Sequence, residues 1–182
     1  MKIQLIGGSG TGKSTLAEYT ADQLGIKWID TDTYLWKDDS FTENHPLEKR
    51  LALYQKDMAE TDSYVASGSI YAWHPKGFQD RDLLVFLSLD ESVRLERLRK
   101  REKHRNNGKN AWLDADGAFT NDFIEWCKTY WTATDKDMIG TYAAQSHELS
   151  LAKCHVLKLD SSCSVEELYA AILQAAKPFM NN

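Results

Sequence analysis

The sequence predicts a three-layer α/β/α fold, in which helices pack on a mostly parallel sheet. Short apolar runs alternate along the chain with segments of helical periodicity, which is the pattern of such folds. The clearest run, residues 83–89, is apolar apart from Ser88 and lies between charged residues. With 182 residues, of which 42% are hydrophobic, the chain matches a single domain, residues 1–182, with a sizeable core.

The first half of the chain alternates between short strands and longer helices. Gly25 is placed to end the first helix, and the spacing of Leu47, Leu51, Tyr54 and Met58 predicts the second. The third strand is expected to end at the sequence Ser-Gly-Ser of residues 67–69. The predicted elements are strands at 2–6, 26–30 and 64–66, and helices at 14–24 and 46–60.

The second half continues the alternation after the strand at 83–89. A charged helix is expected over residues 92–104, ended by the Asn-Asn-Gly of 106–108. A loop at 114–117 leads to a long aromatic helical stretch, 121–149, with a break inside it. A last strand at 156–159 precedes a terminal helix, which the capping box from Ser164 to Glu167 opens.

Composition and charge argue against several classes of function and location. A net charge of −5 is typical neither of sequence-independent nucleic-acid binding nor of a DNA-acting protein. No window has the roughly 20 apolar residues of a membrane span, and no secretion signal is recognised. Cys127, Cys154 and Cys163 form no metal-ligand spacing and no even disulfide set, which favours a reducing compartment, the cytoplasm.

The sequence GGSGTGKS at residues 7–14 matches the phosphate-binding P-loop pattern in full. It lies between a predicted strand and a predicted helix, as the pattern requires, whereas the alternative is a glycine turn that only joins them. In a P-loop the backbone N–H groups and the helix N-terminus hold the phosphates of a nucleotide such as ATP. Lys13 would contact the outer phosphates, and the hydroxyl of Ser14 would hold Mg²⁺. The predicted nucleotide-binding residues are Gly8, Ser9, Gly10, Thr11, Gly12, Lys13, Ser14 and Thr15.

Two carboxylates follow the second predicted strand, where ligands bind in open α/β sheets. Asp30 and Asp32 are two residues apart, so on an extended segment they would point the same way. One of the two carboxylates could lie near Mg²⁺, through water, and the other could accept the proton of an acceptor hydroxyl. The alternative is that one of them caps the helix that follows.

Arginines supply the remaining candidates. Arg97, Arg101 and Arg105 share one face of the charged helix, and Arg97 and Arg101 are the candidates that would neutralise a transferring phosphoryl group with Lys13. The alternative is a solvated face paired with glutamates. Arg50, in the second helix, either binds an anionic group of the acceptor or is simply exposed.

The aromatic stretch after residue 118 is interpreted mainly as core, although its rings could stack on a ligand. Phe123, Cys127, Tyr130, Thr134 and Met138 would lie near one helical face.

The segments IQLIGGSGTGKST, WIDTD, YVASGS and LLVFLSLDESVRLERLRKRE together resemble the small P-loop kinases of the adenylate kinase and shikimate kinase type. The similarity covers most of the chain and is greatest to adenylate-kinase-like bacterial proteins labelled topology modulation protein or nucleoside (uridine) kinase. It implies a five-stranded parallel sheet in the order 2-3-1-4-5, an acceptor-binding lobe near 33–63 and an arginine-bearing helical lid near 101–118. It also implies the roles of Asp30 at Mg²⁺ and of Asp32 at the substrate.

The sequence departs from these families after the third strand. Adenylate-type kinases usually have Asp-Gly there and shikimate kinases three glycines, whereas this chain has Ser67-Gly68-Ser69. Neither shikimate nor AMP is therefore indicated as the acceptor. Gly68 is counted with Asp32 and Arg50 among the candidate substrate-binding residues.

These observations favour an ATP- and Mg²⁺-dependent kinase acting on a nucleoside, nucleotide or other hydroxylated metabolite, as a monomer or homodimer. The alternative is a regulatory P-loop protein that hydrolyses ATP slowly and has no small-molecule acceptor. Both functions need the P-loop, but only the first needs a second substrate beside Asp32.

Overall fold

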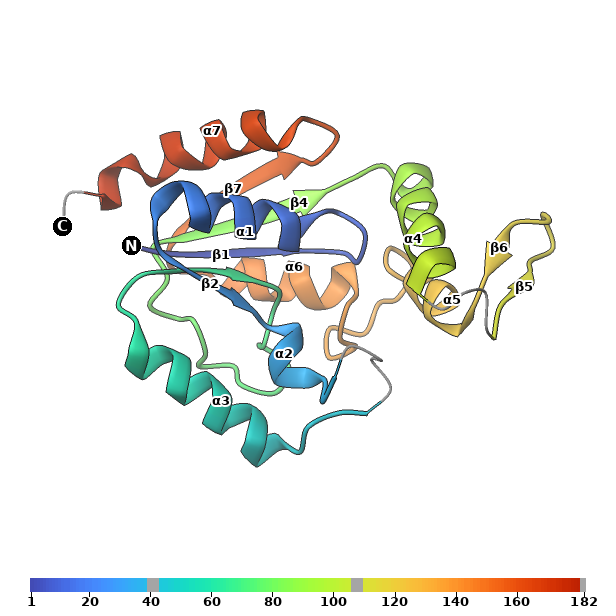
Figure 1. The fold of residues 1–182 in the computed structure, drawn as a ribbon, viewed down its shortest axis with the longest axis horizontal. Helices are drawn as coiled ribbons and strands as arrows, with labels where there is room; N and C mark the ends of the chain where they lie inside the picture. The colour runs from blue at the N-terminus through green and yellow to red at the C-terminus, as the bar shows by residue number, and fades with distance from the viewer. Residues whose placement is uncertain (39–42, 106–109, 181–182) are drawn as a thin grey trace.

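The computed structural model describes residues 1–38, 43–105 and 110–180. Its centre is a parallel sheet in the order β2-β3-β1-β4-β7 (Figure 1). Because β7 is the fifth strand of this sheet along the chain, the predicted order 2-3-1-4-5 is confirmed. The strands are β1 (Lys2–Gly7), β2 (Lys27–Asp30), β3 (Tyr64–Ser67), β4 (Leu83–Ser88) and β7 (His155–Asp160).

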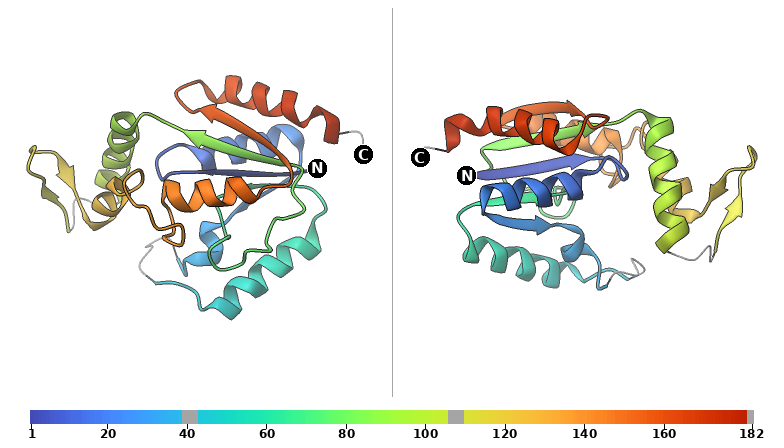
Figure 2. Two further views of the ribbon diagram at one scale, coloured as in Figure 1. Left: turned by 180° about the vertical axis from the view of Figure 1, so that it is seen from behind. Right: turned by 45° about the horizontal axis from the view of Figure 1, so that its top comes forward.

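Helices cover both faces of the sheet, and the two further views in Figure 2 show this arrangement. On one face, α1 and α7 pack on alternate residues of the central strands, such as Ile3, Leu5 and Val85. On the other face, α6 packs against Ile6 and Phe86, while α3 covers the β2 and β3 side. The helices of these layers are α1 (Lys13–Leu24), α3 (Leu47–Glu60), α6 (Tyr142–Leu151) and α7 (Val165–Ala176).

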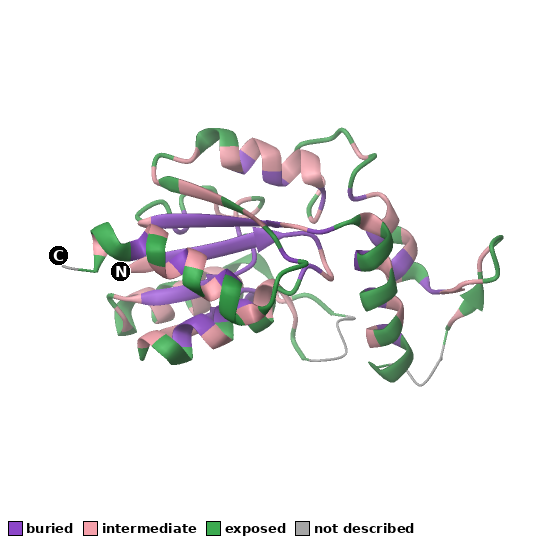
Figure 3. Ribbon diagram, turned by 90° about the horizontal axis from the view of Figure 1, so that it is seen from above, coloured by how far each residue is buried: buried purple, intermediate pink, exposed green. Residues whose placement is uncertain are grey.

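The central strands are buried on both faces, as Figure 3 shows. In β4 the residues from Leu83 to Leu87 are all buried, which is why this strand is a continuous apolar run in the sequence. The apolar interior therefore holds the carboxyl ends of β1, β2 and β3 in fixed positions, and the loops after these strands meet at one edge.

Helix ends follow the predicted signals. Gly25 ends α1 with φ 64°, in the left-handed region where glycine carries no steric penalty. At α7 the Ser164 hydroxyl accepts from the Glu167 backbone and the Glu167 carboxylate accepts from the Ser164 backbone, so the predicted capping box is formed. The charged helix α4 (Glu91–Arg105) extends one residue beyond its predicted range at each end.

Two local predictions need correction, and one is confirmed. A one-turn helix, α2 (Asp32–Leu35), follows β2, where extended chain was expected. The stretch 121–149 divides into α5 (Asp122–Lys128) and α6, so the break predicted inside it is confirmed. The predicted common helical face from Phe123 to Met138 is wrong beyond Cys127, because α5 ends at Lys128, and Thr134 is exposed.

The predicted loop at 114–117 joins two short antiparallel strands, β5 (Trp112–Leu113) and β6 (Phe119–Thr120). This hairpin extends beyond α4, away from the sheet (Figure 1). Parts of two predicted segments lie outside the described part of the chain: residues 106–109 of the lid and residues 39–42 of the acceptor lobe. The predicted helix break at 106–108 lies outside it as well. Within that part, no helix combines the length and apolar character needed to span a membrane.

Candidate functional site

The glycine-rich loop lies between β1 and α1, as predicted. Gly10 and Gly12 have φ of 90° and 84°, a region that other residues rarely adopt, and Gly12 is the N-cap of α1. The backbone N–H and the hydroxyl of Thr11 both donate to the Gly8 carbonyl, at 3.2 and 2.9 Å, which closes the turn. A turn of this kind at a helix N-terminus is suited to bind phosphate.

Helix α4 packs directly on this loop, and Arg94 makes the connection. Only 1% of Arg94 is exposed, and its Nη1 donates to the Ser9 carbonyl at 2.9 Å. Its Nη2 donates at 2.7 Å to the Cys127 carbonyl in α5, and its charge is paired with Glu91. Arg94 therefore joins the loop, α4 and α5 into one unit.

Arg94, one of the five arginines of this helix, was not among the predicted site residues. A signal for its burial was present, because Arg94 is four residues before the apolar Leu98 and so shares its face. Both Arg94 and Leu98 lie near the position that a Cβ on Gly10 would occupy.

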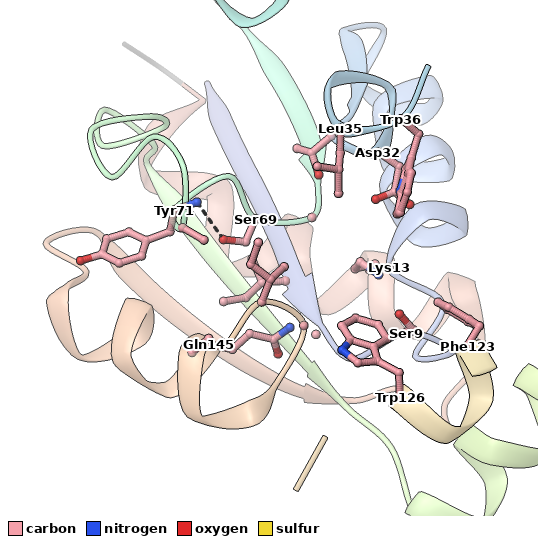
Figure 4. Close-up of a pocket in the computed structure, with 18 of the residues that line it drawn as sticks. Ser9, Lys13, Asp32, Leu35, Trp36, Ser69, Tyr71, Phe123, Trp126 and Gln145 are labelled. Atoms are coloured by element: carbon pink, nitrogen blue, oxygen red, sulfur yellow. Dashed lines mark hydrogen bonds between the residues drawn. The ribbon is translucent and has the colours of Figure 1, made fainter. Parts of the chain in front are cut away.

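A cavity of about 840 Å³ opens beside the loop. Its walls are the loop, α2, the segment after β3, the end of α4, α5 and α6. Figure 4 shows Lys13 between two walls: Asp32 and Trp36 lie on one side, and Ser69 and Gln145 lie on the other. Six of the predicted site residues line it: Ser9, Lys13, Ser14, Asp32, Gly68 and Arg101.

Contrary to the prediction, the two acids at the carboxyl end of β2 do not lie on one extended segment, because Asp30 ends the strand and a helix follows. Asp32 is the first residue of α2, and the Asp30 Oδ1 accepts from the Asp32 backbone N–H at 3.1 Å. The Asp30 carboxylate thus satisfies one backbone N–H at the start of α2, although the N-cap residue of this helix is Thr31. Asp32 is exposed and faces the cavity, so the structure separates the surroundings of the two acids.

Asp30 is nevertheless placed toward the phosphate loop. Burial raises the pKa of its carboxyl, while the hydrogen bond from Asp32 and the positive charge of Lys13 act in the opposite direction. The Asp30 carboxylate and the Ser14 hydroxyl are oxygen donors of the kind that Mg²⁺ prefers. Among the described residues no group of three or more His, Cys, Asp or Glu side chains could hold a metal ion.

Gly68 is required by close packing at the end of β3. Its φ is 106°, and a Cβ there would lie 2.0 Å from the Thr31 Oγ1. Its carbonyl accepts from the Gln4 side chain at 2.8 Å. These contacts hold the segment after β3 against the start of α2, so that Ser69 and Tyr71 form the opposite wall of the cavity.

Two of the predicted arginines lie at the loop and the cavity. The Nη1 of Arg97 lies 3.9 Å from the position that a Cβ would occupy if Gly12 had one. Its Nη2 donates to the Ser161 carbonyl at 3.4 Å. Arg101 lines the cavity with its guanidinium over the Phe123 ring, 5.4 Å from the centroid. Arg97 is thus beside the phosphate loop, and Arg101 is at the cavity mouth formed by α4 and α5.

Arg50 does not reach this site. Its Nε donates to the His45 carbonyl at 2.7 Å, which ties it to the turn before α3, and it is not among the described residues that line the cavity. In this structure Arg50 makes a local contact, and a role of Arg50 at the acceptor stays a prediction from the sequence.

The phosphate loop, the strand order and the flanking helices define a protein of the P-loop kinase fold. The chain belongs to the AAA domain family, because the model of that family matches residues 3–116. It is 32% identical over 171 residues to a Bacillus subtilis (strain 168) protein called uncharacterized protein YqaC, and the match covers 94% of each chain.

Two further similarities concern kinases. Cytidylate kinase of Archaeoglobus fulgidus is 32% identical over 115 residues, 56% of this chain and 62% of that protein. The solved structure of shikimate kinase from Acinetobacter baumannii in complex with shikimate superposes with a TM-score of 0.61 at 14% identity, covering 100% of this chain and 95% of that one. At this identity the second similarity shows a shared fold.

Proposed function

We propose that this protein is an ATP- and Mg²⁺-dependent kinase that transfers a phosphoryl group to a hydroxyl of a small molecule. The observation that carries the proposal is one cavity shared by Lys13 of the phosphate loop and the exposed carboxylate of Asp32. A P-loop protein that only hydrolyses ATP does not need a second wall with aromatic and polar side chains facing that loop. The cytidylate kinase similarity supports a nucleoside or nucleotide acceptor, among other hydroxylated metabolites, and is consistent with the adenylate-kinase-like subtype.

In this proposal the loop residues 8–15 hold the nucleotide phosphates. Lys13 contacts the outer phosphates, and Ser14 and Asp30 bind Mg²⁺, which when present neutralises charge on those phosphates. Arg97 lies beside Gly12 and Arg101 lies at the cavity, so both are placed to stabilise negative charge near the transferring group.

Asp32 would accept a hydrogen bond from the acceptor hydroxyl and so orient its oxygen for attack. Its exposure to the cavity leaves the carboxylate accessible to the hydroxyl of an acceptor. In phosphoryl transfer positioning and electrostatics dominate, so one such carboxylate is sufficient for the protein's part in proton transfer.

The test is ADP release from Mg-ATP with a panel of nucleosides, nucleotides and sugars, using a Lys13→Ala variant prepared in parallel as a measure of contaminating activity. We expect one class of acceptor to raise the rate at least about tenfold above the rate without acceptor, since positioning alone supplies larger factors. Slow release that no acceptor changes would contradict the kinase proposal and favour a regulatory ATPase.

The cytoplasmic location and a monomeric or homodimeric state stay as predictions from the sequence. Binding of nucleic acid is not part of the proposal, because the net charge is −5.

A further inference from the structure

The wall of the cavity opposite Asp32 contains a buried acid, Glu148 of α6. Glu148 lines the cavity although only 4% of it is exposed. The Ser69 hydroxyl donates to its Oε2 at 2.5 Å, and an Nη1 of Arg81 is 3.6 Å from its Oε1. These contacts join α6, the segment after β3 and the segment before β4.

The charges at this wall are already balanced. The side chain of Arg81 is 8% exposed, so its charge needs the neighbouring carboxylate of Glu148. Burial raises the pKa of Glu148, while the hydrogen bond from Ser69, the charge of Arg81 and a contact with Gln4 favour its ionised form. No positive charge of this pair is left over for an anionic ligand.

Glu148 nevertheless has capacity to accept further hydrogen bonds. A carboxylate offers two oxygens with about four acceptor positions. Ser69 and the Gln4 side chain use two of them, and the 3.6 Å separation from Arg81 is an ion-pair distance longer than a hydrogen bond. An oxygen of Glu148 can therefore accept from a group in the cavity.

Gln145, three residues earlier on the same helix, adds a donor. The Tyr130 hydroxyl donates to the Gln145 Oε1 at 2.7 Å. Because this oxygen already accepts a hydrogen bond, the amide nitrogen of Gln145 is the group that can donate to a ligand. Figure 4 shows the Gln145 side chain directed into the cavity on the same side as Ser69 and Tyr71. Trp73 also lines this side, so flat apolar surfaces accompany the polar groups.

We propose that this wall binds the acceptor through hydroxyl or amino groups on an uncharged ring, and that Glu148 discriminates against acceptors that carry a carboxylate there. The inference rests on the proposed function and specifies the acceptor class of the same cavity. A carboxylate at this wall would bring its oxygens against the Glu148 carboxylate with no positive charge left to bind it, whereas a donor group gains a charge-assisted hydrogen bond.

The test uses pairs of compounds that differ mainly in charge: uridine and orotidine, glucose and glucuronate, and methyl shikimate and shikimate. Each is added to the protein without ATP, and binding is followed by the shift in melting temperature; ADP release with Mg-ATP is measured separately. In at least one pair we expect the neutral member to bind at least about tenfold more tightly, which corresponds to about 1.4 kcal/mol. Tighter binding of the acids, or no binding by any neutral member, would overturn the inference.

A Glu148→Gln variant provides the sharper test. It keeps the size of the side chain and leaves Arg81 without its counter-charge, so we expect the preference to reverse: about tenfold weaker binding of the neutral member and stronger binding of the acid. If the role of Glu148 were purely structural, the variant would bind both members of a pair more weakly by the same factor, and that result would contradict the proposal.

Glu96→Gln is the matched control, because Glu96 is exposed on α4 and paired only with Lys100 among the described residues. It should leave every compound's binding unchanged. If Glu148→Gln gives no melting transition, Ser69→Ala replaces it. That variant removes one hydrogen-bond donor from Glu148, and it should weaken the binding of neutral acceptors less than fivefold while the acids still do not bind. Binding of the acids by this variant would contradict the assigned role of Glu148.

The two proposals fail in distinguishable ways. Charge discrimination in the melting experiment without acceptor-dependent ADP release would contradict the kinase function and leave the binding inference standing. Acceptor-dependent release that favours carboxylates would support the kinase function and overturn the inference.

Discussion

At the scale of single residues, Lys13 and Asp32 have distinct tasks in the same cavity. Lys13 belongs to the loop that would hold the nucleotide, while Asp32 belongs to α2 on one side wall. Substitution of Lys13 should therefore change nucleotide binding, and substitution of Asp32 should change transfer to the acceptor. The next two predictions separate these effects.

Lys13→Ala should remove most of the stabilisation by Mg-ATP, because the ε-ammonium would contact the outer phosphates. For the unsubstituted protein with ATP at about 100 times its Kd, we expect a rise in Tm of roughly 5–10 °C, from about 2.7 kcal/mol of binding linkage. Thermal melting with and without Mg-ATP measures this rise in Tm for both proteins. Lys153→Ala, at an exposed position, is the control, and an undiminished shift in Lys13→Ala would contradict the assignment.

Asp32→Asn should keep the ATP-dependent shift in Tm while kcat with the acceptor falls by about 10²–10⁴, the range of a lost general base. The amide has nearly the same size but cannot take a proton. Asp22→Asn, exposed on α1, serves as the control and should behave like the parent protein. Equal turnover in Asp32→Asn and the parent would remove Asp32 from the mechanism.

At the scale of elements, α4 is connected to the phosphate loop by a buried arginine. Arg94 donates to Ser9 in the loop and to Cys127 in α5, and its guanidinium lies 4.9 Å from the Tyr130 ring centroid. Neither carbonyl belongs to the helix that carries Arg94. The position of α4 beside the loop thus depends on charged hydrogen bonds as well as on apolar packing.

Arg94→Met should lower the free energy of unfolding by about 2–4 kcal/mol, because two buried carbonyls lose a charged donor. Urea unfolding measures this change. Lys100→Met on the same helix is the control; Lys100 is exposed and its pair with Glu96 should contribute less than about 1 kcal/mol. Similar losses for the two variants would show that Arg94 does not connect the elements as described.

Ser164→Ala should destabilise the protein by about 1 kcal/mol, because the hydroxyl that caps α7 is lost. Equilibrium urea unfolding is the measurement. Ser162→Ala is a close control, since Ser162 is exposed two residues earlier and its hydroxyl caps no helix. Equal stabilities of the two variants would contradict a contribution from the capping box.

At the scale of the whole molecule, one apolar layer joins the two ends of the chain. Ile172 of α7 belongs to the same buried cluster as Ile3 of β1 and Leu16 of α1. The carboxyl-terminal helix therefore stabilises the sheet from which the phosphate loop extends, although it contributes no residue to the cavity lining described above.

Ile172→Ala should lower the free energy of unfolding by about 2–5 kcal/mol, since the side chain is fully buried and its removal leaves a cavity. Leu151→Ala is the control at a position that is 52% exposed, where a change within about 0.5 kcal/mol is expected. Urea unfolding followed by far-UV circular dichroism and by tryptophan fluorescence should give coincident transitions. A separate early transition would show that α7 unfolds independently of the sheet.

The sequence by itself determined the parallel sheet, its order through the family resemblance, and the phosphate loop. The signals for these are local: apolar runs mark buried strands, and the whole of GGSGTGKS lies within eight residues. The helix α2 was missed because one turn has no periodicity to detect. The common face through Thr134 was wrong because turns after Lys128 end the helical period.

Only the tertiary structure decided which side chains meet around the cavity. Ser69 and Glu148 are 79 residues apart and become hydrogen-bonded because β3 and α6 are brought together by the sheet. The same packing buries Arg94 against the loop and leaves Arg50 in its own turn. Burial and pairing depend on neighbours distant in the chain, so a local pattern such as the spacing of Arg94 and Leu98 marks a helix face but does not identify the partners that bury a charge there.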